Sequence, residues 1–400
     1  MKKLAVAISV YDKFEDVKLI VETLRLNWAH PVHYIVVCSS HPDAPTALAD
    51  ANVDRVIVLD EIPLDFKQFT PAQIKLHLTL RVLESIRRGC QAAMESGAEY
   101  AMHLHADSYA FQAQPVMELI NRMATEGKTF AVRGDGLGLY GPADPIGAFE
   151  DMFFIFDVAF ARERHLWDFD PIDFLPHKLS MHGALAVLAL AKVGLRRLMH
   201  YAHYDSVTYW DGLPVFQVPF NSVRPMCVDD RFAFLHVHDA DFPGTLGQEL
   251  KAYYFQQWGV TRGTTIEAFL KTYGGATKTL FERLAKFEQD LHAFLARIGL
   301  SKTPYARNFM LIVALKRAYE ERRGWSRMWW VAQQQLAAFR AKMLKPVKLF
   351  FLKRIPQYVY PDTQSVLALE KWYQTNVTVT PKSPPYLRDI RLTAFESTSG

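Results

Sequence analysis

Cysteine is scarce in this chain of 400 residues, and long hydrophobic runs are absent from it. The three cysteines, Cys38, Cys90 and Cys227, are odd in number and far apart, so they predict neither a disulfide framework nor a zinc cluster. A reducing compartment therefore suits the chain. No window offers the roughly 18 uninterrupted apolar residues that a membrane-spanning helix needs, so we expect no such helix.

Charged residues are also few, at 22% of the chain, and the formal net charge is only +4. A net charge this small does not by itself indicate nucleic-acid binding. Hydrophobic residues make up 50% of the chain, which is typical of a globular protein with a core and not of a disordered one. The length corresponds to roughly two or three domains, at about 100–200 residues each.

Strand and helix patterns alternate over the first 135 residues. Apolar runs predict strands at 4–10, 33–38, 53–59, 101–105 and 129–133. The first run is followed by Tyr11-Asp12-Lys13 and not by a small-residue cleavage site, so we interpret it as a strand and not as a signal peptide. A long helix is predicted over 71–95, with Pro71 at its start and Gly97 just past its end. This alternation predicts an α/β fold with a mostly parallel sheet.

The pattern changes further along the chain. Residues 152–162 predict a strand that returns to the sheet, and 199–240 predict short strands and loops. Helices are predicted at 178–193, 248–258, 265–273, 277–298 and 305–322. We therefore divide the chain into an α/β domain at 1–245, a helical extension at 246–321, and a basic amphipathic helix with a loosely ordered tail at 322–400.

Several stretches of the N-terminal part follow one another in an informative order. They are Ala7-Ile8-Ser9-Val10-Tyr11, the run from Ile35 to Ser40, the segment from Ser96 to Asp107, and a Pro115-led helix. Together they resemble the GT-A-fold glycosyltransferases of the family-2-like type, which use nucleotide-diphosphate sugars. The resemblance covers about the first 240 residues and none of the last 150. It implies a Rossmann-type, GT-A-like sheet flanked by helices, to which the pattern adds a helical C-terminal region.

One departure from the family lies at its metal motif. The family's strand ends in Asp-x-Asp, whereas this chain has His105-Ala106-Asp107. The resemblance implies a divalent ion that neutralises charge on the leaving nucleotide diphosphate. Mn²⁺ and Mg²⁺ prefer oxygen ligands, and histidine is more compatible with Mn²⁺. We therefore predict Asp107 as a direct metal ligand, and His105 as a second ligand or a phosphate donor.

A late apolar strand, from residue 232 onward, carries two histidines. His236 and His238 share one face of it, because alternate residues of a strand point the same way. The resemblance implies that a late histidine completes the metal shell, with His238 as the first choice and His236 as the second. The alternative is a pair of core histidines bonded to the backbone.

The resemblance places the donor's base and ribose on the tips of the first strands, where open α/β sheets bind ligands. Tyr11 can stack on the base, and Asp12 can accept a hydrogen bond from base or ribose. The other predicted donor contacts are Ser39, Ser40, Asp43 and Asp60. Each of these is also a common loop residue.

Inverting transfer needs a carboxylate that takes the proton from the acceptor hydroxyl. An acidic and aromatic segment precedes the helix predicted at 178–193. In it, Asp170 and Asp173 are the first candidates for this base and Asp168 is the third, while Trp167 and Phe169 are predicted to stack on a sugar ring. The alternative is an acidic turn that caps the helix.

Residues 322–354 contain nine lysines and arginines and no acid. Apolar residues repeat there at alternating spacings of four and three, as one stripe of a helix: Trp325, Trp329, Ala332, Leu336, Phe339 and Met343. An apolar stripe among basic residues is typical of a helix lying on an anionic membrane surface. The alternative is a helix packed on the catalytic domain or on another subunit. We predict no nucleic-acid partner, because no recognition fold accompanies the basic residues.

We therefore predict a cytoplasmic, metal-assisted, inverting glycosyltransferase of the hexosyltransferase type, peripheral at the inner face of the cell membrane. It would move a sugar from a nucleotide-diphosphate donor to a glycan or lipid-linked acceptor in cell-surface polysaccharide synthesis. Two alternatives remain. The run from His103 through His105 to Asp107 is similar to the His-x-His-x-Asp motif of metal-dependent hydrolases. The replaced first acid would also suit a non-catalytic, glycosyltransferase-like membrane adaptor.

Overall fold

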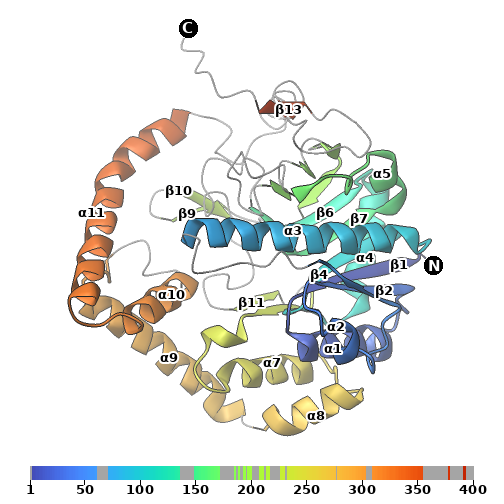
Figure 1. The fold of residues 1–400 in the computed structure, drawn as a ribbon, viewed down its shortest axis with the longest axis horizontal. Coiled ribbons are helices and arrows are strands. Elements are labelled where there is room, and N and C mark those ends of the chain that lie inside the picture. Colours follow the sequence, from blue (N-terminus) through green and yellow to red (C-terminus); the bar gives the residue numbers. More distant parts are fainter. Residues whose placement is uncertain are drawn as a thin grey trace.

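The computed structural model of the protein describes residues 2–60, 71–135, 148–171, 184–185, 188–189, 192–194, 196–200, 207–210, 213–216, 226–229, 232–275, 277–302, 309–354, 377–378 and 391–392. The chain is built around one large sheet, with helices on both of its faces and further helices at the C-terminal end (Figure 1). None of the helices in these ranges is both long and apolar enough to cross a membrane.

The large sheet has seven strands in the order β3-β2-β1-β4-β7-β6-β8. Their bounds are β1 (Leu4–Val10), β2 (Tyr34–Ser39), β3 (Arg55–Val58), β4 (Tyr100–His105), β6 (Phe130–Asp135), β7 (Ala148–Asp157) and β8 (Leu198–His200). Neighbouring strands are parallel except at β7, which runs antiparallel to both β4 and β6. The predicted α/β class with a mostly parallel sheet is confirmed, and the returning strand is β7.

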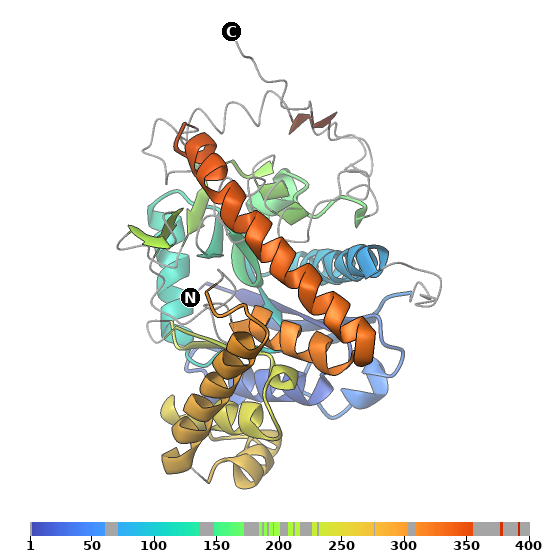
Figure 2. The same cartoon turned by 90° about the vertical axis from the view of Figure 1, so that its left-hand side faces the viewer.

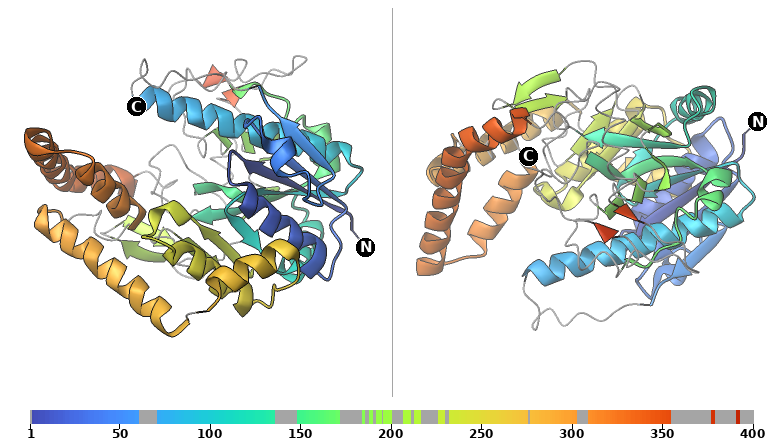
Figure 3. Two further views of the ribbon diagram at one scale, coloured as in Figure 1. Left: turned by 60° about the horizontal axis from the view of Figure 1, so that its bottom comes forward. Right: turned by 90° about the horizontal axis from the view of Figure 1, so that it is seen from above.

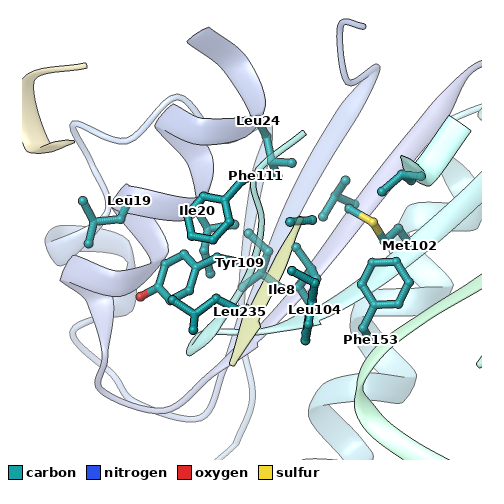
Figure 4. Packing of buried hydrophobic residues seen from close by; sticks show 14 of the residues in the cluster. Ile8, Leu19, Ile20, Leu24, Met102, Leu104, Tyr109, Phe111, Phe153 and Leu235 are labelled. Atoms are coloured by element: carbon teal, nitrogen blue, oxygen red, sulfur yellow. The ribbon is translucent and has the colours of Figure 1, made fainter. Parts of the chain in front are cut away.

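The central strand β1 is buried along its whole length, which explains its unbroken apolar sequence. Leu4, Val6 and Ile8 join a core cluster on one face of the sheet, while Ala5 and Ala7 join a second cluster on the other face. Figure 4 shows part of the first cluster, where side chains of the sheet meet those of the first helix.

Helices cover both faces. The first face is covered by α1 (Phe14–Glu22), η1 (Thr23–Asn27) and α4 (Ala113–Thr125), and the second by α3 (Pro71–Glu95) and α5 (Val158–Glu163). The short α2 (Ala44–Ala47) follows β2. The bounds of α3 are those that the sequence predicts. This helix lies close to the sheet, since a Cβ atom on Gly89 would lie only 3.4 Å from the Cβ of Ala7.

A second, antiparallel sheet lies beside the tip of β4. Its order is β11-β12-β5, with β11 (Met226–Asp229), β12 (Phe234–Val237) and β5 (Ser108–Ala110). Because β5 begins directly after Asp107 and Ser108 pairs with His236, this sheet joins the tip of β4 to the late histidine strand. The other short strands are β9 (Val207–Trp210) with β10 (Leu213–Phe216), and β13 (Val377–Thr378) with β14 (Arg391–Leu392).

The C-terminal part is helical, as predicted. After the turn η3 (Asp239–Asp241) come α7 (Leu246–Gln257), α8 (Thr264–Tyr273), α9 (Thr277–Arg297), α10 (Phe309–Glu320) and α11 (Gly324–Arg354). Residues of α7 and α8, such as Leu250, Phe255 and Ile266, belong to the same core cluster as α1. A third cluster joins α9, α10 and α11. The first core therefore continues across residue 245, where we place a domain boundary.

Candidate active site

Three side chains with metal-binding atoms meet where β4 ends. Asp107 follows β4, His236 lies on β12, and His238 follows β12. Oδ1 of Asp107 lies 3.3 Å from Nε2 of His236, and Oδ2 lies 3.4 Å from Nδ1 of His238. One ligand atom from each residue lies within 4.8 Å of the other two, a spacing that would allow them to share one ion.

Backbone pairing explains why residues about 130 positions apart meet here. The Val237 N–H donates to the Asp107 carbonyl at 3.1 Å, next to the paired residues Ser108 and His236. The two imidazole rings lie 4.4 Å apart, centre to centre. The structure therefore brings together three of the four residues that we predict as metal ligands.

A lysine also contacts the predicted metal ligand. Nζ of Lys13 lies 2.9 Å from Oδ2 of Asp107. Burial alone would raise the pKa of the Asp107 carboxyl, but His236, His238 and Lys13 together hold that pKa well below its ordinary value. Burial would also lower the pKa of Lys13, yet Asp107 raises it. The carboxylate is therefore ionised at neutral pH, as a metal ligand must be.

The set of one carboxylate and two imidazoles fits a divalent transition metal. Such sets bind Mn²⁺, Fe²⁺ or Zn²⁺, and three protein ligands leave coordination positions for a substrate or water. Mg²⁺ fits less well, because it prefers oxygen ligands. To use Oδ2 of Asp107, an ion would have to displace Lys13 from it.

The fourth predicted ligand, His105, lies outside this group. Its Nε2 is 2.8 Å from Oδ2 of the buried Asp151. Burial would lower the pKa of His105, but the Asp151 carboxylate raises it. The structure therefore places His105 on the wall of the site, paired with an acid from β7.

His103, the first residue of the hydrolase-like motif, is fully buried. Its Nε2 lies 2.9 Å from Oγ of Ser9, its Nδ1 lies 2.9 Å from the Asp151 carbonyl oxygen, and its ring stacks on Phe154. Both ring nitrogens thus have protein partners. This arrangement does not suit a His-x-His-x-Asp metal centre.

A pocket opens beside Asp107 at the C-terminal ends of β1 and β4. Its wall includes five of the residues predicted to contact the donor: Tyr11, Asp12, Ser40, His105 and Asp107. Lys13 and Arg81 also line it, and the Arg81 guanidinium lies 4.0 Å from the centre of the Tyr11 ring. The pocket therefore joins the aromatic face of Tyr11 to two cationic side chains and to Asp107 of the candidate metal site.

The remaining predicted donor contacts, Ser39, Asp43 and Asp60, are not among the residues that line this pocket. Oγ of the buried Ser39 donates to the Tyr11 carbonyl at 2.9 Å, so Ser39 holds the loop that carries Tyr11. Asp43 precedes α2, and its carboxylate lies 3.9 Å from Nδ1 of His41. Asp60 is exposed just after β3.

Of the predicted acceptor-side acids, Asp168 lies beside Gln91 of α3. Its carboxylate accepts from Nδ1 of His165 at 2.8 Å and lies 3.4 Å from Nε2 of Gln91. Asp170 is half-buried after it, and Asp173 lies outside the described residues.

The stacking surface that we predict from Trp167 and Phe169 is wrong. Trp167 is 1% exposed and Phe169 is 2% exposed, and both belong to the second core cluster. Trp167 stacks on Phe154 of β7. These aromatics pack against the sheet and cannot contact a sugar.

Sequence reasoning did not include the buried network behind the site. Nζ of Lys251, on α7, lies 2.5 Å from Oδ1 of Asp16 and 2.6 Å from Oδ2 of Asp239. The Tyr109 hydroxyl donates to the same oxygen of Asp16. The network ties α1, β5 and α7 to the turn that follows His238. A lysine within a helical pattern gives no sign of such a role.

No protein-family model matches the chain, and a search of curated proteins finds no match. Among solved structures, the chain is similar to glucosyl-3-phosphoglycerate synthase from Mycobacterium tuberculosis in complex with Mn²⁺, UDP and glucosyl-3-phosphoglycerate. The identity is 12%, the match covers 50% of this chain and 69% of that one, and the TM-score is 0.31. It is also similar to mannosyl-3-phosphoglycerate synthase from Rubrobacter xylanophilus (12%, 50% and 65%, TM-score 0.32). A third similar structure is mouse xyloside xylosyltransferase 1 in its apo form (11%, 50% and 84%, TM-score 0.27). Because these similarities are low, the case for a function rests on the geometry of the site.

Proposed function

We propose that the protein is a metal-assisted glycosyltransferase that uses a nucleotide-diphosphate sugar. The observation that carries this proposal is the position of the Asp107, His236 and His238 cluster. It adjoins a pocket with an aromatic face and cationic groups, at the C-terminal edge of parallel strands. This edge is where open α/β sheets bind ligands.

In this proposal Asp107, His236 and His238 hold a divalent ion, with Mn²⁺ favoured over Mg²⁺ because two of the ligands are imidazoles. The ion, when bound, supplies positive charge to the diphosphate as the sugar departs. Lys13 adds positive charge on the same side of the pocket, and the raised pKa of His105 favours its charged form. These groups together stabilise the anionic leaving group.

The base and ribose of the donor would bind over Tyr11. The tyrosine ring already has a guanidinium against it, from Arg81 at 4.0 Å. Asp12 and Ser40 lie on the same wall and can bond to ribose or base. Ser39, Asp43 and Asp60 would act from the rim.

The acceptor side is proposed from the sequence. Asp170 and Asp173 are the proposed bases for an inverting transfer. Asp168 is the third candidate, because its carboxylate already contacts His165 and Gln91. We propose a hexosyl transfer to a glycan or lipid-linked acceptor of cell-surface polysaccharide, in the cytoplasm at the inner face of the membrane. The basic helix at 322–354 supports that location.

Nucleotide binding tests the central proposal. UDP or GDP together with Mn²⁺ should raise the melting temperature by several degrees, because a ligand that binds only the folded state stabilises it. Asp107→Asn should abolish this shift. Asp50→Asn makes the same chemical change at an exposed carboxylate that pairs with Lys18, and it should leave the shift intact. A full shift in the Asp107 variant would contradict the proposal.

Two results would favour the alternatives. Zinc in the purified protein, with no response to any nucleotide, would favour a hydrolase. Nucleotide binding without hydrolysis or transfer of any donor in a nucleotide-sugar screen would favour the non-catalytic adaptor. Release of UDP or GDP from one donor would establish the enzyme and identify its donor.

A further inference from the structure

Helix α11 exposes a row of large apolar side chains. Trp325 is 84% exposed, Trp329 is 68% exposed, and Phe339 and Met343 are each about 60% exposed. Successive residues of a helix are rotated by about 100°, so positions 325, 329, 332, 336, 339 and 343 fall on one side of it. We name these six residues the outer stripe of α11. All six are exposed.

The opposite side of α11 packs on the protein. Ala338 is buried in the third core cluster, and Trp330 and Val331 pack against that cluster. Nε2 of Gln335 donates to the Ile298 carbonyl at 2.7 Å, at the end of α9. Figure 2 shows α11 running across the near side of the molecule, in front of the other C-terminal helices. Among the residues that the structure describes, the packing contacts of α11 therefore lie on the side away from the outer stripe.

The charge around the outer stripe is of one sign. Residues 322–354 contain nine lysines and arginines and no acid. Arg340 and Lys342 are exposed within the length of the stripe. Isolated exposed apolar residues are ordinary, but a continuous row of them marks a binding surface.

We propose that the outer stripe of α11 docks on an anionic lipid bilayer. Tryptophan favours the boundary between headgroups and acyl chains, and basic residues are attracted to anionic headgroups. A second copy of the chain suits the surface less well, because pairing two stripes would bring together two segments that carry only positive charge. The views in Figure 3 place α11 at the edge of the molecule, where a flat surface can reach it. The proposal depends on α11 alone and not on the proposed transfer activity.

Vesicle sedimentation of the full chain tests the proposal. The wild-type protein should pellet with vesicles of equal parts phosphatidylcholine and phosphatidylglycerol, and not with phosphatidylcholine alone. The variant Trp325→Ser/Trp329→Ser/Phe339→Ser should bind on the order of tenfold more weakly. The matched control Leu26→Ser/Phe281→Ser removes exposed apolar side chains from other helices and should bind as the wild type does.

A second variant tests the charges. Arg340→Gln/Lys342→Gln should weaken binding by about tenfold or more, and added salt should weaken the wild type in the same way. Equal binding by wild type and the triple variant would overturn the proposal, as would equal binding to neutral vesicles. The proposal would also be overturned if the wild type bound no vesicles but formed a dimer in analytical ultracentrifugation that the triple variant does not form.

Discussion

One side chain, Asp107, connects the parts of the candidate site. Its two oxygens face His236, His238 and Lys13 within 3.4 Å. Lys13 contributes part of the positive charge that such a buried carboxylate requires. An ion bound to Asp107 would release Lys13 toward the pocket, where a phosphate could take it as a partner.

Lys13→Met should therefore change metal and nucleotide affinity in opposite directions. Mn²⁺ alone should bind roughly fivefold more tightly, because the ion no longer has to displace the Lys13 ammonium from Asp107, an ion pair worth about 1 kcal/mol. UDP in the presence of Mn²⁺ should bind about tenfold more weakly, because a charged hydrogen bond is lost. Isothermal titration calorimetry measures both affinities. Lys18→Met, which affects an ion pair with Asp50, is the control and should change neither. Parallel losses of both affinities would exclude this role of Lys13.

His103 should make the folded state sensitive to acid. Burial, with a contribution from His105, lowers the pKa of His103 to about 3, whereas the unfolded chain returns it to about 6.5. Between these values the unfolded state binds a proton that the folded state does not. Stability is therefore lost as pH falls through this window, by at most about 1.4 kcal/mol per pH unit.

Urea unfolding at several pH values measures this contribution. His105 has a raised pKa and works in the opposite direction, so the comparison must be with His103→Gln and not with the wild type alone. The stability advantage of the wild type over this variant should shrink as pH falls from neutral toward 4. An advantage that stays constant with pH would mean that His103 does not remain neutral.

At the scale of helices and strands, Lys251 links the helical extension to the site. Its ammonium group is the shared partner of Asp16 and Asp239, and the residue is only 1% exposed. Lys251→Met should destabilise the protein by about 3–5 kcal/mol, because two acids would lose their buried partner. Lys251→Arg should recover part of this loss. Lys18→Met removes two ion pairs with exposed carboxylates, those of Glu15 and Asp50, and should cost about 1 kcal/mol or less. Chemical denaturation compares the three variants, and a Lys251→Met loss no larger than the Lys18→Met loss would refute the network's role.

The sequence predicts elements well where their pattern is long. The helix over 71–95 has the predicted bounds because a proline and a glycine mark its ends, and the buried β1 is legible as an unbroken apolar run. The three-residue strand β5 is too short to show a period. The antiparallel direction of β7 is also not encoded in its apolar residues, since a buried run reads the same in either direction.

The candidate site was predictable only in part, for similar reasons. Asp107, His236 and His238 are conspicuous because each follows or lies on an apolar strand. Lys13 and Arg81 come from a loop and a long helix, and only the fold brings both to one pocket. Trp167 failed as a predicted sugar contact because an aromatic beside an acid has the same sequence pattern whether it is buried or exposed.

At the scale of the whole molecule, we propose that residues 1–245 do not fold as a self-sufficient unit, because the first core cluster extends beyond them. Leu250, Phe255 and Ile266 pack in the same cluster as Ile20 of α1 and Phe111. Removing everything after residue 245 would expose that apolar surface to water. It would also remove Lys251 and leave its two acids without their partner.

Truncation tests this view of the core. A chain of residues 1–245 should aggregate or lack a cooperative unfolding transition, because burial of the first cluster requires α7 and α8. A chain of residues 1–321 should keep a cooperative transition. Among the buried residues described in the three clusters, Ala338 is the only one that comes from α11. Circular dichroism during thermal unfolding separates the two outcomes. A sharp transition in the shorter chain would show that the α/β part folds alone, and that the helical extension is an addition to it and not a part of its core.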